Sequence, residues 1–342
     1  MPATSNPVAH TIDTPSSLWP GLLLSAGLAA VAFGLGQWLP LIGGPVFGIV
    51  LGVVVRNLAP PPMTCRPGIR FAGQNILQWS IVALGFGLSL TQVAHTGMDS
   101  LAVTLVSVAA AFGAALLLGR LLGIPSKLKL LIGAGTAICG GSAIAAVTPI
   151  IKADEHDTAF AISTIFLFNL VAVLVFPALG HLMGMSQEGF GLWAGTAIND
   201  TSSVVAAGYS YGAAAGDHAT IVKLTRATLI IPLCLLLATI EAWRQKKHGG
   251  GDFALRRVIP WFILWFVVAS AVSTAGVIPD AWQPAIRLGA KLLIIVALTA
   301  IGLSADLRRM AATGFRPIAL GLGVWVAVAL SSLGVQYVTG QV

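Results

Sequence analysis

Residues 194–208 read Ala-Gly-Thr-Ala-Ile-Asn-Asp-Thr-Ser-Ser-Val-Val-Ala-Ala-Gly and lie inside a long apolar segment. Five consecutive polar residues, Asn199 to Ser203, stand where a lipid-facing helix would have none. A carboxylate at the middle of a bilayer costs at least about 2.5 kcal/mol, so it needs a partner or a water-filled site. The first five residues recur at 134–138 and there lead into Cys139-Gly140-Gly141-Ser142. The two stretches are predicted to form the walls of a polar site inside a membrane.

The composition indicates an integral membrane protein. Of the 342 residues, 56% are hydrophobic and only 9% are charged, whereas soluble chains carry about 25% charged residues. The net charge of +7 is not typical of a nucleic-acid-binding surface, because the basic residues lie in short loops between apolar segments. Three cysteines, Cys65, Cys139 and Cys234, are far apart and have no metal-ligand spacing.

Membrane-spanning segments follow from the rule that a spanning helix needs about 20 mostly apolar residues. Eleven segments qualify, at approximately 19–38, 42–57, 70–94, 100–122, 128–151, 157–183, 189–211, 218–243, 257–278, 284–306 and 316–338. The predicted fold is therefore all-α and polytopic. Residues 1–18 are predicted to form a flexible cytoplasmic tail, and residues 19–342 a single transmembrane domain.

The basic residues predict the orientation, because Lys and Arg near helix ends remain on the cytoplasmic side. They gather between spans two and three, four and five, eight and nine, and ten and eleven, all of which lie on one face. The opposite face is assigned the acids Asp99, Asp154, Glu155, Asp157, Asp217 and Asp280. The N-terminus is therefore predicted inside and the C-terminus outside.

An internal repeat is suggested by spans five and ten. Lys129-Leu-Leu-Ile132, Thr136-Ala-Ile138 and Ser142 correspond to Lys291-Leu-Leu-Ile294, Thr299-Ala-Ile301 and Ser304. Spans five apart cross in opposite directions, as in an inverted-topology repeat. The prediction is two five-helix repeats, about 42–183 and 189–338, after one extra N-terminal helix. Span three also resembles span ten, and that pairing remains an alternative.

Glycines in spans five and ten predict interrupted helices near Gly140–Gly141 and near Gly302 that lie close together. The N-terminus of a second half-helix carries partial positive charge and free N–H groups, which suit an anion. The alternative is that these glycines only allow close helix packing. The predicted substrate-binding residues are Thr136, Cys139, Gly140, Gly141, Ser142, Thr201, Ser202, Ser203, Arg226, Thr299, Gly302 and Ser304.

The sequence resembles the YeiH family of bacterial inner-membrane proteins, commonly labelled sulfate exporters, from about span two to the C-terminus. The most specific matching motifs are Gly135-Thr-Ala-Ile-Cys-Gly-Gly-Ser142, Ala194-Gly-Thr-Ala-Ile-Asn-Asp-Thr-Ser202 and Lys223-Leu-Thr-Arg226. The family is grouped with cation–proton antiporters and bile-acid sodium symporters. The resemblance implies broken crossing helices, an elevator-like motion and a coupling-ion role for Asn199 and Asp200.

Deep charges leave two interpretations open. Asp200 is either a coupling-ion or proton site or one half of a structural ion pair, for which Arg226 is the natural partner on the next span. Lys223 shares a helix face with Arg226, since the two are three residues apart. Lys291 lies about two turns into span ten, where its side chain could extend to the interface or act as a charge partner.

Other polar residues receive structural interpretations. Asp154-Glu155-His156-Asp157 resembles a metal cluster in composition, but a solvated loop with helix-capping acids is the preferred interpretation. No metal or cofactor is predicted. Interhelical hydrogen bonds are the preferred role for the remaining polar residues of the spans, Gln74, Asn75, Gln78 and Asn169.

The leading hypothesis is a secondary transporter of a small anion, of the sulfate, sulfite or organic sulfonate class, coupled to H⁺ or Na⁺. The runner-up is a cation–proton antiporter that uses Asp200 and has no anion site. An intramembrane enzyme is disfavoured, because the chain has no His-Glu-x-x-His and no nucleophile–base pair. The expected partners are the solute, the coupling ion and the lipid bilayer, and a homo-oligomer is left open.

Overall fold

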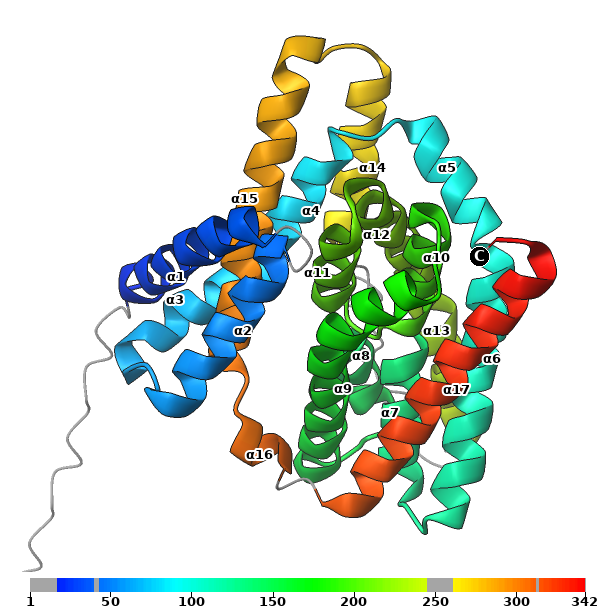
Figure 1. Ribbon diagram of the computed structural model, residues 1–342. Coiled ribbons are helices and arrows are strands. Elements are labelled where there is room, and N and C mark those ends of the chain that lie inside the picture. Colours follow the sequence, from blue (N-terminus) through cyan, green and yellow to red (C-terminus); the bar gives the residue numbers. More distant parts are fainter. Residues whose placement is uncertain (1–16, 40–42, 245–260, 312–313, 342) are drawn as a thin grey trace, which may run out of the picture.

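The computed structural model describes residues 17–39, 43–244, 261–311 and 314–341. These residues are helical apart from short connections (Figure 1). The helices are α1 (Trp19–Trp38), α2 (Gly43–Leu58), η1 (Met63–Cys65), α3 (Arg66–Phe71), η2 (Ala72–Ile76), α4 (Leu77–Gly85), α5 (Leu90–Asp99), α6 (Leu101–Leu121), α7 (Ser126–Ala137), α8 (Gly141–Ile150), α9 (Glu155–Leu182), α10 (Gln187–Ala197), α11 (Thr201–Tyr211), α12 (Ala213–Thr228), α13 (Ile230–Arg244), α14 (Trp261–Thr274), η4 (Asp280–Trp282), α15 (Gln283–Ser304), α16 (Leu307–Ala311) and α17 (Phe315–Thr339). Of the predicted tail, 1–18, residues 1–16 lie outside the described residues.

Several helices are long and apolar enough to cross a membrane. Six qualify among the described residues: Trp19–Trp38, Leu101–Leu121, Glu155–Leu182, Ala213–Glu241, Gln283–Ser304 and Phe315–Thr339. A seventh candidate joins Met63–Gly85 to Leu90–Asp99 through a bend of 107°. The all-helical fold class and the membrane assignment agree with the sequence prediction. The predicted third span, 70–94, contains this bend, and two further predicted spans, the fifth and the seventh, have a different shape.

The predicted fifth span is interrupted at 138–140, as its glycines indicated, but its two halves fold back on one another. Lys127 Nζ, at the start of α7, donates to the backbone oxygen of Lys152, just after α8, at 2.6 Å. Within the pair, a Cβ on Gly135 would lie 3.0 Å from the Ile144 side chain. Gly140 has φ +66°, a conformation that glycine adopts without strain. Helices α7 and α8 therefore form a hairpin and not a crossing.

The predicted seventh span is a second hairpin, made by α10 and α11 with a turn at 198–200. The Tyr211 ring at the end of α11 stacks on Phe190 at the start of α10, with centroids 3.9 Å apart. Gln187 Oε1, in the first turn of α10, accepts a hydrogen bond from Ala215 N at 3.3 Å. The outer ends of this hairpin therefore lie together.

The two hairpins enter the protein from opposite ends. Helix α9 connects their bases and has 28 residues, which is a length of about 42 Å. The four half-helices have 10 to 12 residues each, or about 15–18 Å. Their tips therefore meet near the middle, where a Cβ on Gly140 would lie 3.4 Å from Asp200 Cβ. Figure 1 shows α7 and α8 in the lower half and α10 and α11 in the upper half.

The predicted break near Gly302 is wrong, because α15 is continuous from Gln283 to Ser304. Gly302 instead packs directly on the backbone of α2 at Ile49 and Gly52, where a side chain would clash. Close helix packing, the alternative interpretation, accounts for this glycine. Helix α15 packs mainly on α1, α2 and α4. The pairing of spans five and ten therefore loses its main support.

One loop assignment is also wrong. The acidic turn at Asp154 was expected on the face opposite to Lys127, but α8 returns the chain to the end at which α7 begins. The reason is that a hairpin reverses direction where a crossing would not. Lys127, Lys152 and Asp154 therefore lie on one side of the molecule.

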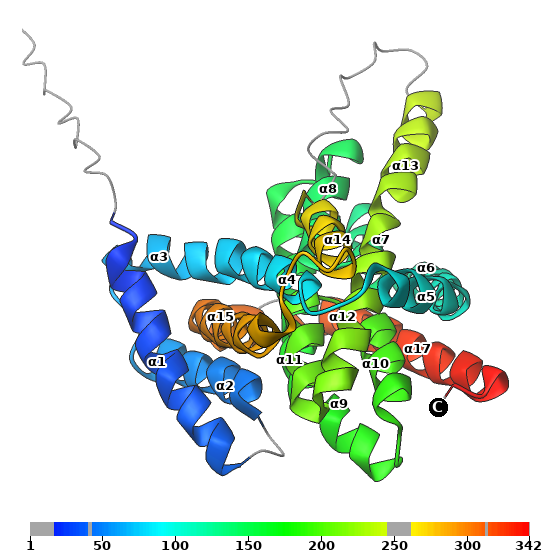
Figure 2. The same ribbon diagram turned by 90° about the horizontal axis from the view of Figure 1, so that it is seen from above.

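The helices form two groups that we name by their content. The hairpin bundle comprises α6–α13 and α17, and its largest buried cluster includes Ile132, Ile165, Phe190 and Val324. The flanking bundle comprises α1–α4, α14 and α15. Figure 2 shows α1, α2, α3 and α15 to one side of the hairpin bundle. Helix α11 packs against α2 and α15 and so connects the two bundles.

Candidate functional site

A cavity of about 750 Å³ lies between the two bundles, beside the hairpin tips. Its walls come from α2, α3, η2, α4, α14 and α15 of the flanking bundle, from α8, α9 and α11 of the hairpin bundle, and from α16. The charged and polar lining residues are Arg56, Arg70, Gln74, Asn75, Gln78, Ser142, Ser163, Asn169, Asp200, Thr201, Ser202, Ser203, Ser304 and Asp306. So many polar groups beside apolar helices are typical of a solute site.

The first hairpin contributes the N-terminus of α8. Gly141 and Ser142, its first two residues, line the cavity. No side chain caps this helix end, and the first N–H groups of a helix have no partner within the helix. The N-terminus also carries about half a positive charge. This end of α8 is therefore suited to an anionic or dipolar ligand.

The second hairpin contributes an N-terminus that carries its own carboxylate. Asp200 is the N-cap of α11, and its Oδ2 accepts hydrogen bonds from Ser202 N at 3.0 Å and from the Ser202 hydroxyl. Asp200 N in turn donates to Asn169 Oδ1 of α9 at 3.2 Å. Asn169 is only 3% exposed, and its Nδ2 has no partner among the described residues. One buried amide donor is therefore left at the cavity wall.

The wall opposite the hairpins contains a π-helical turn, η2, within the third predicted span. Gln74, Asn75 and Gln78 from this region line the cavity. Turns of π-helix occur frequently at functional sites. Sequence reasoning assigned these three residues to interhelical hydrogen bonding. The available signal was their clustering in one turn of an otherwise apolar segment.

Arg226 lies behind the hairpin tips and not in the cavity. Its side chain is fully buried. Its Nε donates to Ala137 O at 2.6 Å, its Nη2 to Thr136 O at 2.7 Å and its Nη1 to Thr196 O. These oxygens are the unpaired C-terminal carbonyls of α7 and α10, which favour a cation. Arg226 therefore binds both hairpins through their backbones.

This geometry corrects two expectations about Arg226. It was predicted to bind substrate, but it is absent from the cavity lining and its guanidinium donates to three backbone carbonyls. It was also the natural ion-pair partner of Asp200, yet the described ion pairs do not include these two residues. The guanidinium of Arg226 is instead neutralised by the carbonyls at the C-terminal ends of α7 and α10, which sequence spacing does not reveal.

The remaining predicted site residues divide into two sets. Those lining the cavity are Gly141, Ser142, Asp200, Thr201, Ser202, Ser203, Gly302 and Ser304. Those that do not line it are Thr136, Cys139, Gly140, Asn199, Lys223, Lys291 and Thr299. Thr136 and Thr299 each donate from Oγ1 to the carbonyl four residues earlier in their own helix. Lys291 is exposed on α15. Solute binding by the first set stays a prediction.

An ion pair lies at the edge of the cavity. Arg56 Nη2 of α2 is 3.2 Å from Asp306 Oδ2, just beyond α15. The neighbouring Asn57 donates from Nδ2 to Ala305 O at 2.9 Å and accepts from Leu307 N at 3.0 Å. These bonds fix the turn between α15 and α16 against α2. Arg70 also lines the cavity and is exposed.

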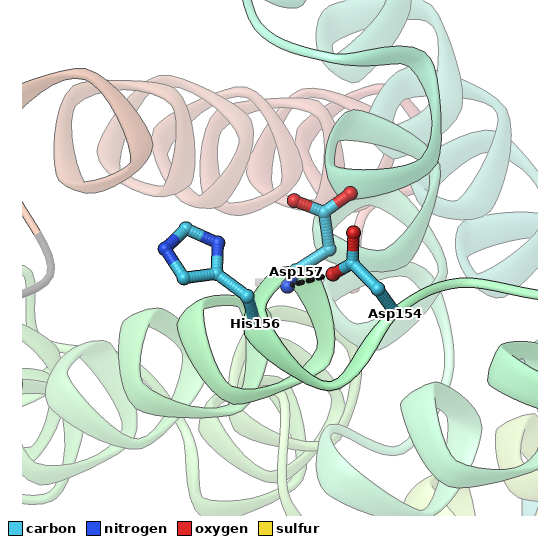
Figure 3. A group of neighbouring side chains, drawn as sticks. All are labelled: Asp154, His156 and Asp157. Atoms are coloured by element: carbon cyan, nitrogen blue, oxygen red, sulfur yellow. Dashed lines mark hydrogen bonds between the residues drawn. The ribbon is translucent and has the colours of Figure 1, made fainter.

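The acidic group at the start of α9 is drawn in Figure 3. Ligand atoms of Asp154, His156 and Asp157 lie within 4.8 Å of one another. Asp154 Oδ1 accepts a hydrogen bond from Asp157 N at 2.7 Å and is the N-cap of α9. His156 packs edge-on against Phe160. The helix-capping interpretation therefore explains Asp154 without a metal.

Comparison with known proteins identifies the family. Residues 20–321 match the family described as Conserved hypothetical protein 698. A UPF0324 membrane protein of Fusobacterium nucleatum is 40% identical over 340 residues, covering 94% of this chain and 98% of the relative. UPF0324 membrane proteins of Streptococcus pyogenes serotype M3 and Streptococcus mutans are 43% and 41% identical, each over 94% of this chain and 97% of the relative. The chain therefore belongs to the family of Conserved hypothetical protein 698, and the relatives it matches are UPF0324 membrane proteins.

Proposed function

We propose that this membrane protein is a secondary active transporter of a small anion, of the sulfate, sulfite or organic sulfonate class. The observation that carries the proposal is the meeting of two opposed hairpin tips beside one polar cavity. Many secondary transporters use interrupted helices at mid-membrane, where free backbone groups bind solute and coupling ion. Irregular backbone at that depth requires a protein-lined or water-filled surrounding, which the cavity provides.

Chemistry at the cavity wall favours an anion. The uncapped N-terminus of α8 presents partial positive charge beside the Ser142 hydroxyl. Asn169 adds a buried amide Nδ2 that has no partner among the described residues. On the flanking bundle, Arg70 adds a positive charge to the same cavity. The resemblance to the YeiH family supports the sulfate class within small anions.

Alternating access is the mechanism we propose. The cavity separates the hairpin bundle from the flanking bundle, so a displacement of one against the other would expose it to either side. The motif Ala-Gly-Thr-Ala-Ile occurs in two hairpins that point in opposite directions, which supports an inverted repeat of transporter type. An intramembrane enzyme would need a nucleophile–base pair or a metal-ligand motif, which the sequence lacks.

Membrane topology follows from treating each hairpin as re-entrant. Of the eleven predicted segments, the fifth and seventh then return to their own sides, and about nine cross. This odd number leaves the N-terminus in the cytoplasm and the C-terminus outside, in a bacterial inner membrane. Basic residues between the predicted spans two and three, four and five, eight and nine, and ten and eleven remain on the cytoplasmic side.

A cation–proton antiporter is the second candidate. It is favoured by Asp200, whose carboxylate lies at the hairpin tips and lines the cavity. In this case Asp200 would carry the transported cation or proton, and α8 would bind no solute. In the preferred case Asp200 carries the coupling ion.

The two functions are separated by reconstitution. Purified protein in proteoliposomes is assayed for uptake of labelled sulfate, sulfite, taurine and small carboxylates, with a Na⁺ or pH gradient. The anion transporter requires uptake of at least one anion and its loss in Asn169→Leu and Ser142→Val. The matched control is Ser331→Val on α17, which does not line the cavity. Cation–proton exchange with no uptake of any of these anions would favour the antiporter.

A further inference from the structure

Lys223 of α12 lies between the two hairpin tips. Its side chain is fully buried. Its Nζ donates to Ile138 O at 2.8 Å and to Ile198 O at 2.9 Å. These isoleucines hold the same position in the repeated Ala-Gly-Thr-Ala-Ile, one in each hairpin. One amine therefore joins equivalent carbonyl oxygens of the two occurrences of this motif.

The two carbonyls belong to a type of site that ordinarily attracts a small cation. Helices α7 and α10 end at Ala137 and Ala197, and each helix C-terminus carries about half a negative charge. In transporters with interrupted helices, such ends and the unwound carbonyls after them coordinate the coupling Na⁺ or H⁺. The N···O distances of 2.8 and 2.9 Å match charge-assisted hydrogen bonds.

The charges around the tips leave no negative excess that a mobile metal ion would have to neutralise. In each hairpin the C-terminal and N-terminal helix ends meet at the break and nearly cancel. Three charged side chains remain there, Lys223, Arg226 and Asp200, while Cys139 is a buried thiol. With Lys223 protonated, the sum is about +1, which a bound anion would neutralise.

The geometry points to Lys223 as a tethered cation that takes the place of a coupling alkali ion at the hairpin tips. It follows that anion transport, which rests on the function proposed above, needs neither Na⁺ nor K⁺ at this position. It also follows that removal of the ammonium creates a binding site for a small monovalent cation between Ile138 O and Ile198 O.

The experiment measures melting temperature in detergent for the wild type and for Lys223→Ala. Each protein is titrated with methylammonium, ammonium, potassium or sodium chloride, and choline chloride serves as the control for ionic strength. A ligand that binds only the folded state raises the melting temperature. Lys223→Ala is expected to melt lower than the wild type and to recover saturably with at least one small cation. Asp200→Asn with Lys223 intact, which lacks the carboxylate assigned to the coupling ion, should respond equally to all five salts. Lys291→Ala, which removes an exposed lysine, should behave like the wild type.

Two outcomes would overturn the inference. One is a Lys223→Ala protein that folds but shows no cation response beyond that of choline. The other is an Asp200→Asn protein, which keeps Lys223 but lacks the carboxylate assigned to the coupling ion, whose melting temperature still responds specifically to Na⁺ or K⁺; this measurement decides the matter even if Lys223→Ala does not fold. Cation binding by Lys223→Ala in detergent requires no transported solute, so it remains readable if no anion is transported.

Discussion

The two hairpins begin their turns alike and leave them differently. Both carry Ala-Gly-Thr-Ala-Ile, and in both the last carbonyls accept hydrogen bonds from Lys223 and Arg226. After the isoleucine the first hairpin continues with Cys139-Gly140 and the second with Asn199-Asp200. The N-terminus of α8 consequently has no side-chain cap, whereas Asp200 caps α11.

This difference gives the two similar hairpins different chemical groups at their tips. The repeated motif gives each hairpin an equivalent helix C-terminus, and Lys223 and Arg226 bind both of these ends. Divergence leaves one positive helix end accessible to the cavity and places a carboxylate on the other. We infer that solute binds beside α8 and that the coupling ion is handled at Asp200. The variants below test each half of this division.

Removal of Arg226 is expected to have the largest effect. Arg226→Leu leaves three buried carbonyls without their donor, and each unpaired group costs about 1–3 kcal/mol. Both hairpins should be destabilised, and little folded protein should remain in size-exclusion and melting assays. Lys291→Leu on the exposed face of α15 is the control. Restoration of folding by Asp200→Asn in the Arg226→Leu background would contradict the account, because it would make the two residues an ion pair.

Gly140→Ala should have the next largest effect, and Gly141→Ala provides the matched comparison. Gly140 has φ +66° and ψ −127°, a conformation that costs a residue with a Cβ about 1–3 kcal/mol. Gly141 lies in α8, and a Cβ added there would lie 3.9 Å from its nearest neighbour, the Phe166 ring, so alanine should be neutral or slightly stabilising. Melting temperatures of both variants check this. Equal melting temperatures would mean that the first turn does not need its glycine.

Asp200 variants separate capping from charge. Asn is as good an N-cap as Asp, whereas Ala loses about 1 kcal/mol. We therefore expect Asp200→Asn to keep the wild-type melting temperature and Asp200→Ala to melt lower. Both should lose dependence of uptake on the coupling gradient while anion binding persists. Intact coupling in Asp200→Asn proteoliposomes would exclude Asp200 as the coupling site.

Sequence reasoning could predict the helices and the break at 138–140, because apolar runs and adjacent glycines are local signals. The predicted first span, 19–38, coincides with α1, and the predicted last span, 316–338, differs from α17 by one residue at each end. It could not distinguish a hairpin from a crossing. Either shape has the same apolar content, and the difference lies in tertiary packing, such as that of α10 and α11 on α12 and of α7 on α9.

The candidate site could be predicted only in part, because only some of its residues have a local sequence signal. Asp200 to Ser203 could be predicted as lining residues, because a run of polar side chains is costly in lipid. Arg226 was misassigned, since its partners are backbone carbonyls that no residue type reveals. Gln74 and Asn75 were not predicted to line the cavity, because no local sequence signal indicated the π-helical turn that contains them.

The two hairpins predict that the chain enters and leaves each of them on one side of the membrane. Single cysteines are introduced at Gly123→Cys, Ala153→Cys, Gly184→Cys and Gly212→Cys, after Cys65, Cys139 and Cys234 are replaced by alanine. A membrane-impermeant maleimide is then applied to right-side-out and inverted vesicles. We expect positions 123 and 153 to label from the cytoplasmic side and positions 184 and 212 from the opposite side. Labelling of 123 and 153 from opposite sides would mean that the first hairpin is a crossing and would contradict the account.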